Sequence, residues 1–391
     1  MKHLKNLIYL IVTTLLLSSC ISFGGGDKNG SDAQFLVLQT NNENKIANGA
    51  SLSLMEVKKG EAKYTTLNAY YPHSDLRNNV DIAKQRVAMG LHRDFNNDGS
   101  SRRTNGGWFD IEAPTCEIPP LLPSGKGRYS YFDVSSAKVS DSGHIFYLSA
   151  SNDADYYDQY RASLVRYNPA TDKLETALNP DGFIISQPEK GWDTEASLFK
   201  SQFYPSADGR YVYGMLSAFG LDFGSYHYDY EILFKYDFDT ETYTRLGDAE
   251  DKHVIILGAT SDKNYVAYST SVNKTYLRKI VNVSTNKTST CTITGGQAYS
   301  NTSRWNKTGY CSGETNNTIG VYNLVSDTFT KINTPARPEY AQFSSGGDFL
   351  YFMIESATGK FLLKTSDLTE TTKIDTVCTL QSSVYEYMVI K

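Results

Sequence analysis

The sequence is poor in charge, in histidine and in cysteine, and each shortage argues against a class of protein. Only 21% of the 391 residues are charged, and 38 basic against 43 acidic side chains leave a net charge of −5. No basic field attracts nucleic acid, so no nucleic-acid partner is expected. The five cysteines form no C-x-x-C pair, which leaves a zinc or thioredoxin-type site without support. The G-x-S-x-G and H-E-x-x-H signatures of common hydrolases and metalloproteases are also missing.

Aromatic residues, in contrast, are abundant. The chain has 29 Tyr and 18 Phe, and 40% of its residues are hydrophobic. This content is enough for a large buried core, and aromatic residues favour strands over helices. Composition therefore predicts a folded, strand-rich protein.

Long apolar runs are missing except at the N-terminus. Lys2 and Lys5 precede the apolar segment Leu7–Leu17, which is too short to span a bilayer and fits a signal peptide. The tetrapeptide Leu17-Ser18-Ser19-Cys20 resembles the lipobox of bacterial lipoproteins. The resemblance implies a signal peptide over residues 1–19 and acylation of Cys20, which would anchor the chain to a membrane. An ordinary secretory signal with a chance cysteine is the alternative.

The residues after Cys20 bear on location. By resemblance to enterobacterial sorting rules, Ile21 in place of an aspartate implies the outer membrane rather than the inner one. Residues 20–33 then comprise the acylated cysteine and a flexible polar tether. The membrane face on which the body stands is left open.

Four cysteines remain beyond the anchor, namely Cys116, Cys291, Cys311 and Cys378. An oxidising envelope permits disulfides, and four cysteines allow three pairings. Cys291 and Cys311 are the favoured pair, because they are close enough in sequence for neighbouring strands. Buried, unpaired thiols are the alternative.

The body repeats one unit about every 40–50 residues. A Ser/Asp/Gly-type turn is followed by an aromatic-rich strand, a second strand and a D-x-x-T-like turn. Five copies of the unit begin at Ser140, Ser206, Ser261, Trp305 and Ser344. Short alternating strands with turn residues between them are typical of four-stranded blades.

This unit resembles the repeats of TolB-like β-propellers. The resemblance implies an all-β fold over residues 34–391, a six- or seven-bladed β-propeller of four-stranded antiparallel blades. Residues Gln34–Val57 fit part of a further unit, and Val384–Ile390 is expected to complete the first blade and close the ring. Residues 69–128 fit no unit and are interpreted as a long irregular insert. Helical spacing of apolar residues predicts a short helix over Val80–Leu91 within it.

Two long segments between second and third strands are expected to be loops on one face, Ser151–Tyr160 and Ser217–Tyr230. Tyrosines supply large, rigid contact area with a polar tip, which suits a binding surface. The candidate binding residues are Tyr156, Tyr157, Asp158, Tyr160, Phe223, Tyr226, His227 and Tyr228. The alternative is that these aromatic residues pack the loops onto the body.

One motif within the insert has calcium-ligand spacing. Oxygen-bearing residues alternate before and after a glycine, as at the start of an EF-hand loop, at Asp94, Asn96, Asp98 and Ser100. The twelfth position is Asn105 instead of the bidentate glutamate of that motif. A Ca²⁺ site and an Asx-rich turn are therefore both open interpretations.

The leading functional hypothesis is a lipid-anchored propeller that binds an envelope protein or a glycan without catalysis, and a small-molecule substrate is not expected. The alternative is a carbohydrate-active enzyme on the same face, a polysaccharide lyase or a glycosidase. For this alternative, His227 with Asp222 and Asp229 is the only group of side chains that suggests itself. A third hypothesis is a subunit of an envelope assembly.

Overall fold

In the computed structural model, every regular element among the described residues is a β-strand. The described residues are 33–39, 50–71, 80–89, 92–95, 101–104, 107–117, 130–131, 137–151, 162–178, 194–222, 225–260, 264–272, 275–290, 309–315, 317–323, 328–344, 349–367 and 373–390. Within these ranges no helix could cross a membrane. The lipobox-like segment, Cys20 and the tether up to Asp32 lie outside them.

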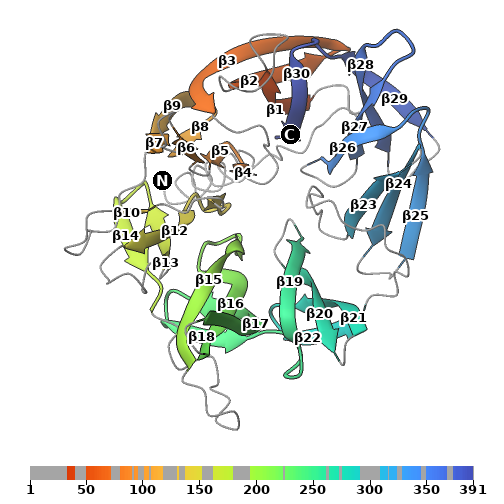
Figure 1. Ribbon diagram of the computed structural model, residues 1–391. Coiled ribbons are helices and arrows are strands. Elements are labelled where there is room, and N and C mark those ends of the chain that lie inside the picture. Colours follow the sequence, from red (N-terminus) through yellow and green to blue (C-terminus); the bar gives the residue numbers. More distant parts are fainter. Residues whose placement is uncertain are drawn as a thin grey trace, which may run out of the picture.

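Antiparallel sheets stand side by side around a ring (Figure 1). The first has the order β3-β2-β1-β30 and consists of β1 (Ala33–Gln39), β2 (Ala50–Lys58), β3 (Glu61–Tyr71) and β30 (Val384–Val389). The second has the order β4-β5-β8-β9 and consists of β4 (Val80–Ala83), β5 (Arg86–Met89), β8 (Gly107–Asp110) and β9 (Ala113–Glu117). Between β5 and β8 the chain forms a separate two-stranded ribbon of β6 (His92–Phe95) and β7 (Ser101–Thr104).

Five further sheets complete the described part of the ring. The third contains β10 (Ser130–Tyr131), β11 (Lys138–Val139), β12 (Ile145–Ser151), β13 (Ala162–Asn168) and β14 (Lys173–Thr176). The fourth contains β15 (Thr194–Pro205), β16 (Tyr211–Asp222), β17 (Ser225–Asp237) and β18 (Thr242–Arg245). The fifth contains β19 (Lys252–Ala259), β20 (Tyr265–Val272), β21 (Thr275–Asn282) and β22 (Lys287–Thr290). The sixth contains β23 (Gly309–Thr315), β24 (Thr318–Asn323) and β25 (Thr328–Asn333), and the seventh contains β26 (Pro338–Phe343), β27 (Phe349–Glu355), β28 (Phe361–Asp367) and β29 (Ile374–Thr379). The fold is an all-β propeller.

The core lies between neighbouring sheets, since strands present alternate residues to opposite faces. Leu36 and Leu52 of the first sheet pack with Val87 of the second, and Phe146 of the third sheet packs with Phe234 of the fourth. Equivalent clusters join the fourth sheet to the fifth, the sixth to the seventh, and the seventh to the first. The first, second, third, fourth and seventh sheets are therefore apolar on both faces.

The predicted irregular insert is wrong over Val80–Met89 and Gly107–Glu117, because these residues supply the second sheet of the ring. The predicted helix over Val80–Leu91 is wrong as well. The strands β4 and β5 form a hairpin in which Ala83 pairs with Arg86, and Lys84 in the turn has a left-handed φ of 54°.

The physical reason is that apolar residues in this segment also recur at every second position, which is the period of a strand, in addition to showing helical spacing. Val80, Val87 and Met89 pack in the cluster shared with the first sheet. Ala88 belongs instead to the cluster shared with the third sheet, together with Trp108 of β8. A strand buried on both faces reads as a nearly continuous apolar run, which periodicity alone cannot distinguish from a buried helix.

The two ends of the described chain meet in the first sheet. β30 pairs with β1 along Phe35↔Val389 to Gln39↔Val384. On the other side of β30, the fully buried amide of Gln342 on β26 donates to the Tyr387 carbonyl at 2.7 Å and accepts from the Val389 N–H at 3.1 Å. A side chain thus supplies the backbone groups of β30 with partners from the seventh sheet, and the ring is closed there by hydrogen bonds.

Candidate functional site

The first and second strands of several sheets are joined by one kind of turn. In each turn a hydroxyl accepts a backbone N–H four or five residues later: Ser140 from His144, Ser206 from Tyr211, Thr260 from Tyr265 and Ser344 from Phe349. This bond explains the recurring Ser or Thr of the repeat, since short hydroxyl side chains satisfy turn backbone locally. We call the face of the ring that carries these turns the tight-turn face.

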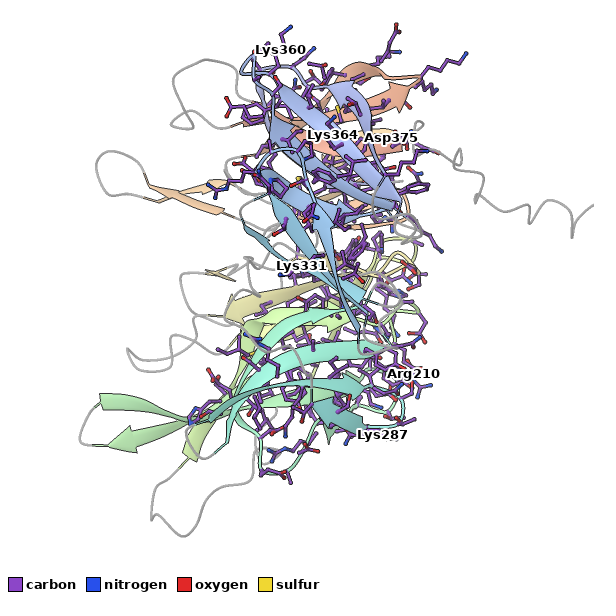
Figure 2. The ribbon with its side chains drawn as sticks, turned by 90° about the vertical axis from the view of Figure 1, so that its right-hand side faces the viewer. Arg210, Lys287, Lys331, Lys360, Lys364 and Asp375 are labelled. Atoms are coloured by element: carbon purple, nitrogen blue, oxygen red, sulfur yellow. The ribbon has the colours of Figure 1, made fainter. Side chains whose placement is uncertain are left out.

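The opposite face carries two projecting hairpins (Figure 2, left-hand side), and we call it the arm face. One is the ribbon β6–β7. The other, the β16–β17 arm, consists of the outer halves of β16 and β17, which stay paired out to Asp222↔Ser225. β15 also runs along this arm and pairs with β16 as far as Gly220.

The β16–β17 arm corrects the sequence interpretation of Ser217–Tyr230 as a loop. Apart from Phe223 and Gly224, which lie outside the described residues, this segment is strand. The pairs Phe219↔Tyr228 and Leu221↔Tyr226 occupy one face of the arm, and Gly220↔His227 and Asp222↔Ser225 occupy the other. The alternation of apolar and polar residues is strand chemistry, and it gives the arm an aromatic face and a polar face.

The register also places the residues proposed for catalysis. Asp222 and His227 share the polar face of the β16–β17 arm. Asp229 is the extra residue of a β-bulge, because Ala218 pairs with Tyr230 and Phe219 with Tyr228. The other candidate binding residues lie outside the described part of the chain, namely Tyr156, Tyr157, Asp158, Tyr160 and Phe223.

The calcium-like motif lies on the ribbon β6–β7. Asp94 is on β6 and pairs with Arg102 of β7, while Asn96, Asp98 and Ser100 lie outside the described residues. Elsewhere, the residues whose side chains are described contain no group of three possible metal ligands. The Ca²⁺ site stays a prediction.

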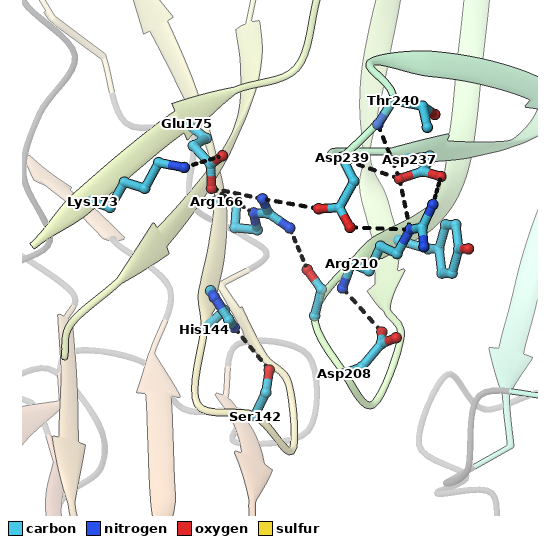
Figure 3. A network of polar contacts seen from close by, with 12 residues as sticks. Ser142, His144, Arg166, Lys173, Glu175, Asp208, Arg210, Asp237, Asp239 and Thr240 are labelled. Atoms are coloured by element: carbon cyan, nitrogen blue, oxygen red, sulfur yellow. Dashed lines mark hydrogen bonds and ion pairs between the residues drawn. The ribbon is translucent and has the colours of Figure 1, made fainter. Parts of the chain in front are cut away.

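Charged side chains on the tight-turn face hold neighbouring sheets together. Arg86 makes a bidentate ion pair with Asp110 in its own sheet, at 2.7 and 2.9 Å, and donates to the Gly143 carbonyl of the third sheet at 2.7 Å. Arg166 repeats this arrangement one sheet further on, with Glu175 at 2.9 Å and the Gly209 carbonyl at 3.1 Å (Figure 3). Both guanidinium groups are therefore engaged in contacts that stabilise the fold.

The two turns that accept these bonds require glycine. Gly143 and Gly209 have φ values of +88° and +74°, a region that residues with a Cβ avoid. A Cβ on Gly209 would also lie 2.7 Å from Nδ1 of His144, which in turn contacts the Ser142 hydroxyl at 2.8 Å. Burial, assisted by the charge of Arg166, lowers the pKa of His144 and favours the neutral imidazole.

Arg210 and Asp237 form a further ion pair in the fourth sheet (Figure 3). The guanidinium donates to both carboxylate oxygens at 3.0 and 2.7 Å, and the Asp239 N–H adds a bond at 2.9 Å. The hydrogen bonds from Arg210 hold the pKa of Asp237 at about 2, against the opposing effect of burial.

This depressed pKa predicts an acid-sensitive contribution to stability. A carboxyl whose pKa is lower in the folded than in the unfolded protein stabilises the fold above its unfolded pKa, near 4, and loses this contribution as pH falls through about 2. Urea unfolding between pH 5 and 2 should therefore show a steeper loss of stability for the wild type than for Asp237→Asn. Equal pH dependences would contradict the assignment.

Sequence reasoning missed these inter-sheet contacts. A signal was present, because Arg86 begins a second strand, Arg210 immediately precedes one, and Asp110 and Asp237 each end the third strand of the same sheet. The contacts to Gly143 and Gly209, however, depend on how adjacent sheets approach each other.

Cys378 is buried and unpaired, and burial raises its pKa to about 11. The predicted Cys291–Cys311 pair involves residues whose side chains are not described.

No protein family and no curated protein matches the chain. Among solved structures it is similar to prolyl endopeptidases, with a TM-score of 0.50 and 11% identity over 88% of this chain and 49% of that chain. It is also similar to an oligogalacturonate lyase in complex with manganese, with a TM-score of 0.48 and 12% identity over 90% and 87% of the two chains. For TolB from Acinetobacter baumannii the TM-score is 0.37, with 12% identity over 91% and 82%. Such identities speak for the fold and transfer no activity.

Proposed function

We propose that this chain is an outer-membrane lipoprotein, anchored through Cys20, whose seven-bladed ring acts as a non-catalytic binding or scaffold module for an envelope protein or glycan. The observation that carries the proposal is the β16–β17 arm. It projects from the ring (Figure 2) and places Phe219, Leu221, Tyr226 and Tyr228 on one of its faces. Rigid aromatic residues on a paired ribbon contribute contact area at a low entropic cost.

The place where the chain enters the ring supports a position of the arm on the side away from the proposed lipid anchor. β1 begins at Ala33, which pairs with Val57 next to the β2–β3 turn at Lys59 and Gly60. That turn lies at the same end of the sheets as the tight turns, so the described chain begins at the tight-turn face. The twelve residues of the tether from Ile21 to Asp32 reach at most about 40 Å. With Cys20 in a membrane, a tether that joins the body at the tight-turn face would leave the arm face free to meet a partner.

The proposal is tested by photo-crosslinking in the cell envelope. A photoreactive phenylalanine analogue replaces Tyr228 on the aromatic face of the arm, or His227 on the polar face one residue away. Tyr228 should give a discrete crosslinked product and His227 should not. The double variant Tyr226→Ser/Phe219→Ser should abolish capture, while Ser225→Ala should leave it unchanged.

Equal crosslinking from both positions, or undiminished capture by the double variant, would contradict a binding role for the aromatic face. The melting temperature of each variant is measured alongside. A folding defect is thereby separated from a loss of binding.

A further inference from the structure

The turn at Ser142 and the turn at Gly209 meet between the third and the fourth sheet on the tight-turn face (Figure 3). The Ser142 N–H donates to the Ala207 carbonyl at 3.0 Å, which is a direct backbone hydrogen bond from one turn to the other. Arg166 of the third sheet adds its bond to the Gly209 carbonyl at 3.1 Å. These two hydrogen bonds join the sheets where the turns touch.

The imidazole of His144 lies in this contact. It is half-buried, and its Nδ1 is 2.7 Å from the position that a Cβ on Gly209 would take, so the ring packs directly against that turn. Nδ1 contacts the Ser142 hydroxyl at 2.8 Å, and this hydroxyl contacts the Ser140 hydroxyl at 2.8 Å. Either hydroxyl can rotate to donate or to accept, so both serines accommodate a protonated and an unprotonated Nδ1. The protonation state of the ring is therefore decided by its surroundings.

Two guanidinium groups lie beside the ring. Arg86 donates to the carbonyl of Gly143, the residue before His144, and Arg166 donates to the carbonyl of Gly209, against which the ring packs. A proton added to the imidazole would place a third cation in this half-buried contact. Such a charge is opposed by the loss of hydration and by repulsion from the two arginines.

Carboxylates around the contact counteract the arginines only in part. The charged residues of the surrounding network are Arg86 and Asp110 in the second sheet, Asp141, Arg166, Lys173 and Glu175 in the third, and Asp208, Arg210 and Asp239 in the fourth. Glu175 and Asp208 favour the protonated ring. Burial, and after it the charge of Arg166, outweighs them and holds the pKa of His144 below its ordinary value of 6.5.

We propose that His144 is an acid-sensitive latch between the third and the fourth sheet. The neutral ring lets the Ser142 turn close on the Gly209 turn, and the protonated ring drives the two turns apart. This is a regulatory property of the tight-turn face, which the proposed binding function does not require.

Linkage gives the direction of the pH effect. An open contact exposes His144 to water, where the imidazole binds a proton at its ordinary pKa of 6.5, whereas the closed contact resists protonation. The stabilisation of the closed state is therefore complete above pH 6.5 and is lost as pH falls through the lower pKa of the closed state.

Hydrogen exchange of the full chain in detergent tests the latch. Exchange is measured by mass spectrometry between pH 7.5 and 5 on the peptides that contain Ser142 and Gly209, and each rate is divided by the intrinsic rate at that pH. We expect the opening of both turns to increase as pH falls, by up to about tenfold per pH unit. NMR titration should give His144 a pKa below 6.5.

Two histidines supply matched variants. His144→Asn keeps a polar side chain beside Ser142 but cannot titrate, so the opening of its turns should be the same at pH 7.5 and at pH 5. His253→Asn makes the same change at an exposed histidine of β19, whose φ of 53° asparagine tolerates. This control should keep the pH dependence of the wild type.

The latch is overturned if the opening of the turns still depends on pH in His144→Asn, or if His253→Asn abolishes that dependence as well. Turns that are already open at pH 7.5 in His144→Asn would indicate a packing defect of that variant. The titration of the wild type then decides, because a pKa of His144 at or above 6.5 contradicts the proposal.

Discussion

Replacing Tyr387 by alanine is expected to lower the free energy of unfolding by about 3–5 kcal/mol. Tyr387 is fully buried on β30 and packs edge-on against Phe35 of β1, with ring centroids 5.7 Å apart. Its hydroxyl donates to the Tyr340 carbonyl of β26 at 2.7 Å. One side chain therefore joins the first sheet to the seventh. Its removal leaves a cavity where the two ends of the ring meet, and urea unfolding measures the loss.

The matched control is Tyr387→Phe, which keeps the ring and removes only the hydroxyl. It should cost about 1 kcal/mol, the usual net value of one hydrogen bond. Similar losses for the two variants would mean that the contact to Tyr340, and not the packing against Phe35, holds the closure. A small loss for both would show that the ring remains stable without this contact between its ends.

Replacing Lys279 by methionine is the second change with a large expected effect: it should lower the free energy of unfolding by about 3–5 kcal/mol. Lys279 on β21 is buried, and its ammonium group contacts Asp251 and Asp248, both at 2.6 Å. Burial alone would lower the pKa of Lys279, but the two carboxylates outweigh it and raise this pKa. Without the ammonium group, Asp251 is left as a buried charge that accepts only from the Tyr268 hydroxyl at 2.6 Å and the Asp248 N–H at 3.3 Å among the contacts described.

A double-mutant cycle isolates the buried pair. Lys279→Met combined with Asp251→Asn removes the stranded charge and should recover part of the loss. Asp248→Asn serves as the control, because that side chain is 41% exposed and an exposed pair contributes at most about 1 kcal/mol. Additive losses in the cycle would contradict the coupling between Lys279 and Asp251.

The repeated units were predictable because each carries its own local chemistry. The hydroxyls of Ser140, Ser206 and Ser344 accept backbone N–H groups of their own turns, so the same residues recur wherever the same turn is made. The aromatic-rich strands that follow alternate with period two. Neither signal depends on distant parts of the chain, and the prediction of an all-β propeller followed from them.

The second sheet was not predictable in the same way. Val80, Val87 and Ala88 are apolar because β4 and β5 are covered on both faces by neighbouring sheets. Sequence spacing cannot show that two other sheets supply this cover, so the spacing alone favours a helix. The β16–β17 arm has the composition of a binding loop, since it is rich in tyrosine and glycine. Only the pairing of Phe219 with Tyr228 revealed a strand extension.

The sequence by itself determined the local elements of this protein: the tight turns, the alternating strands and the residues available for binding. Tertiary structure decided which of those residues share a surface. Arg86 contacts Gly143, Gln342 contacts β30, and Arg93 lies opposite Arg103 only because strands are paired in one register. A shift by one residue would exchange the two faces of every strand. Register and the approach of one sheet to the next are collective properties of the folded chain, so they cannot be read from spacing along it.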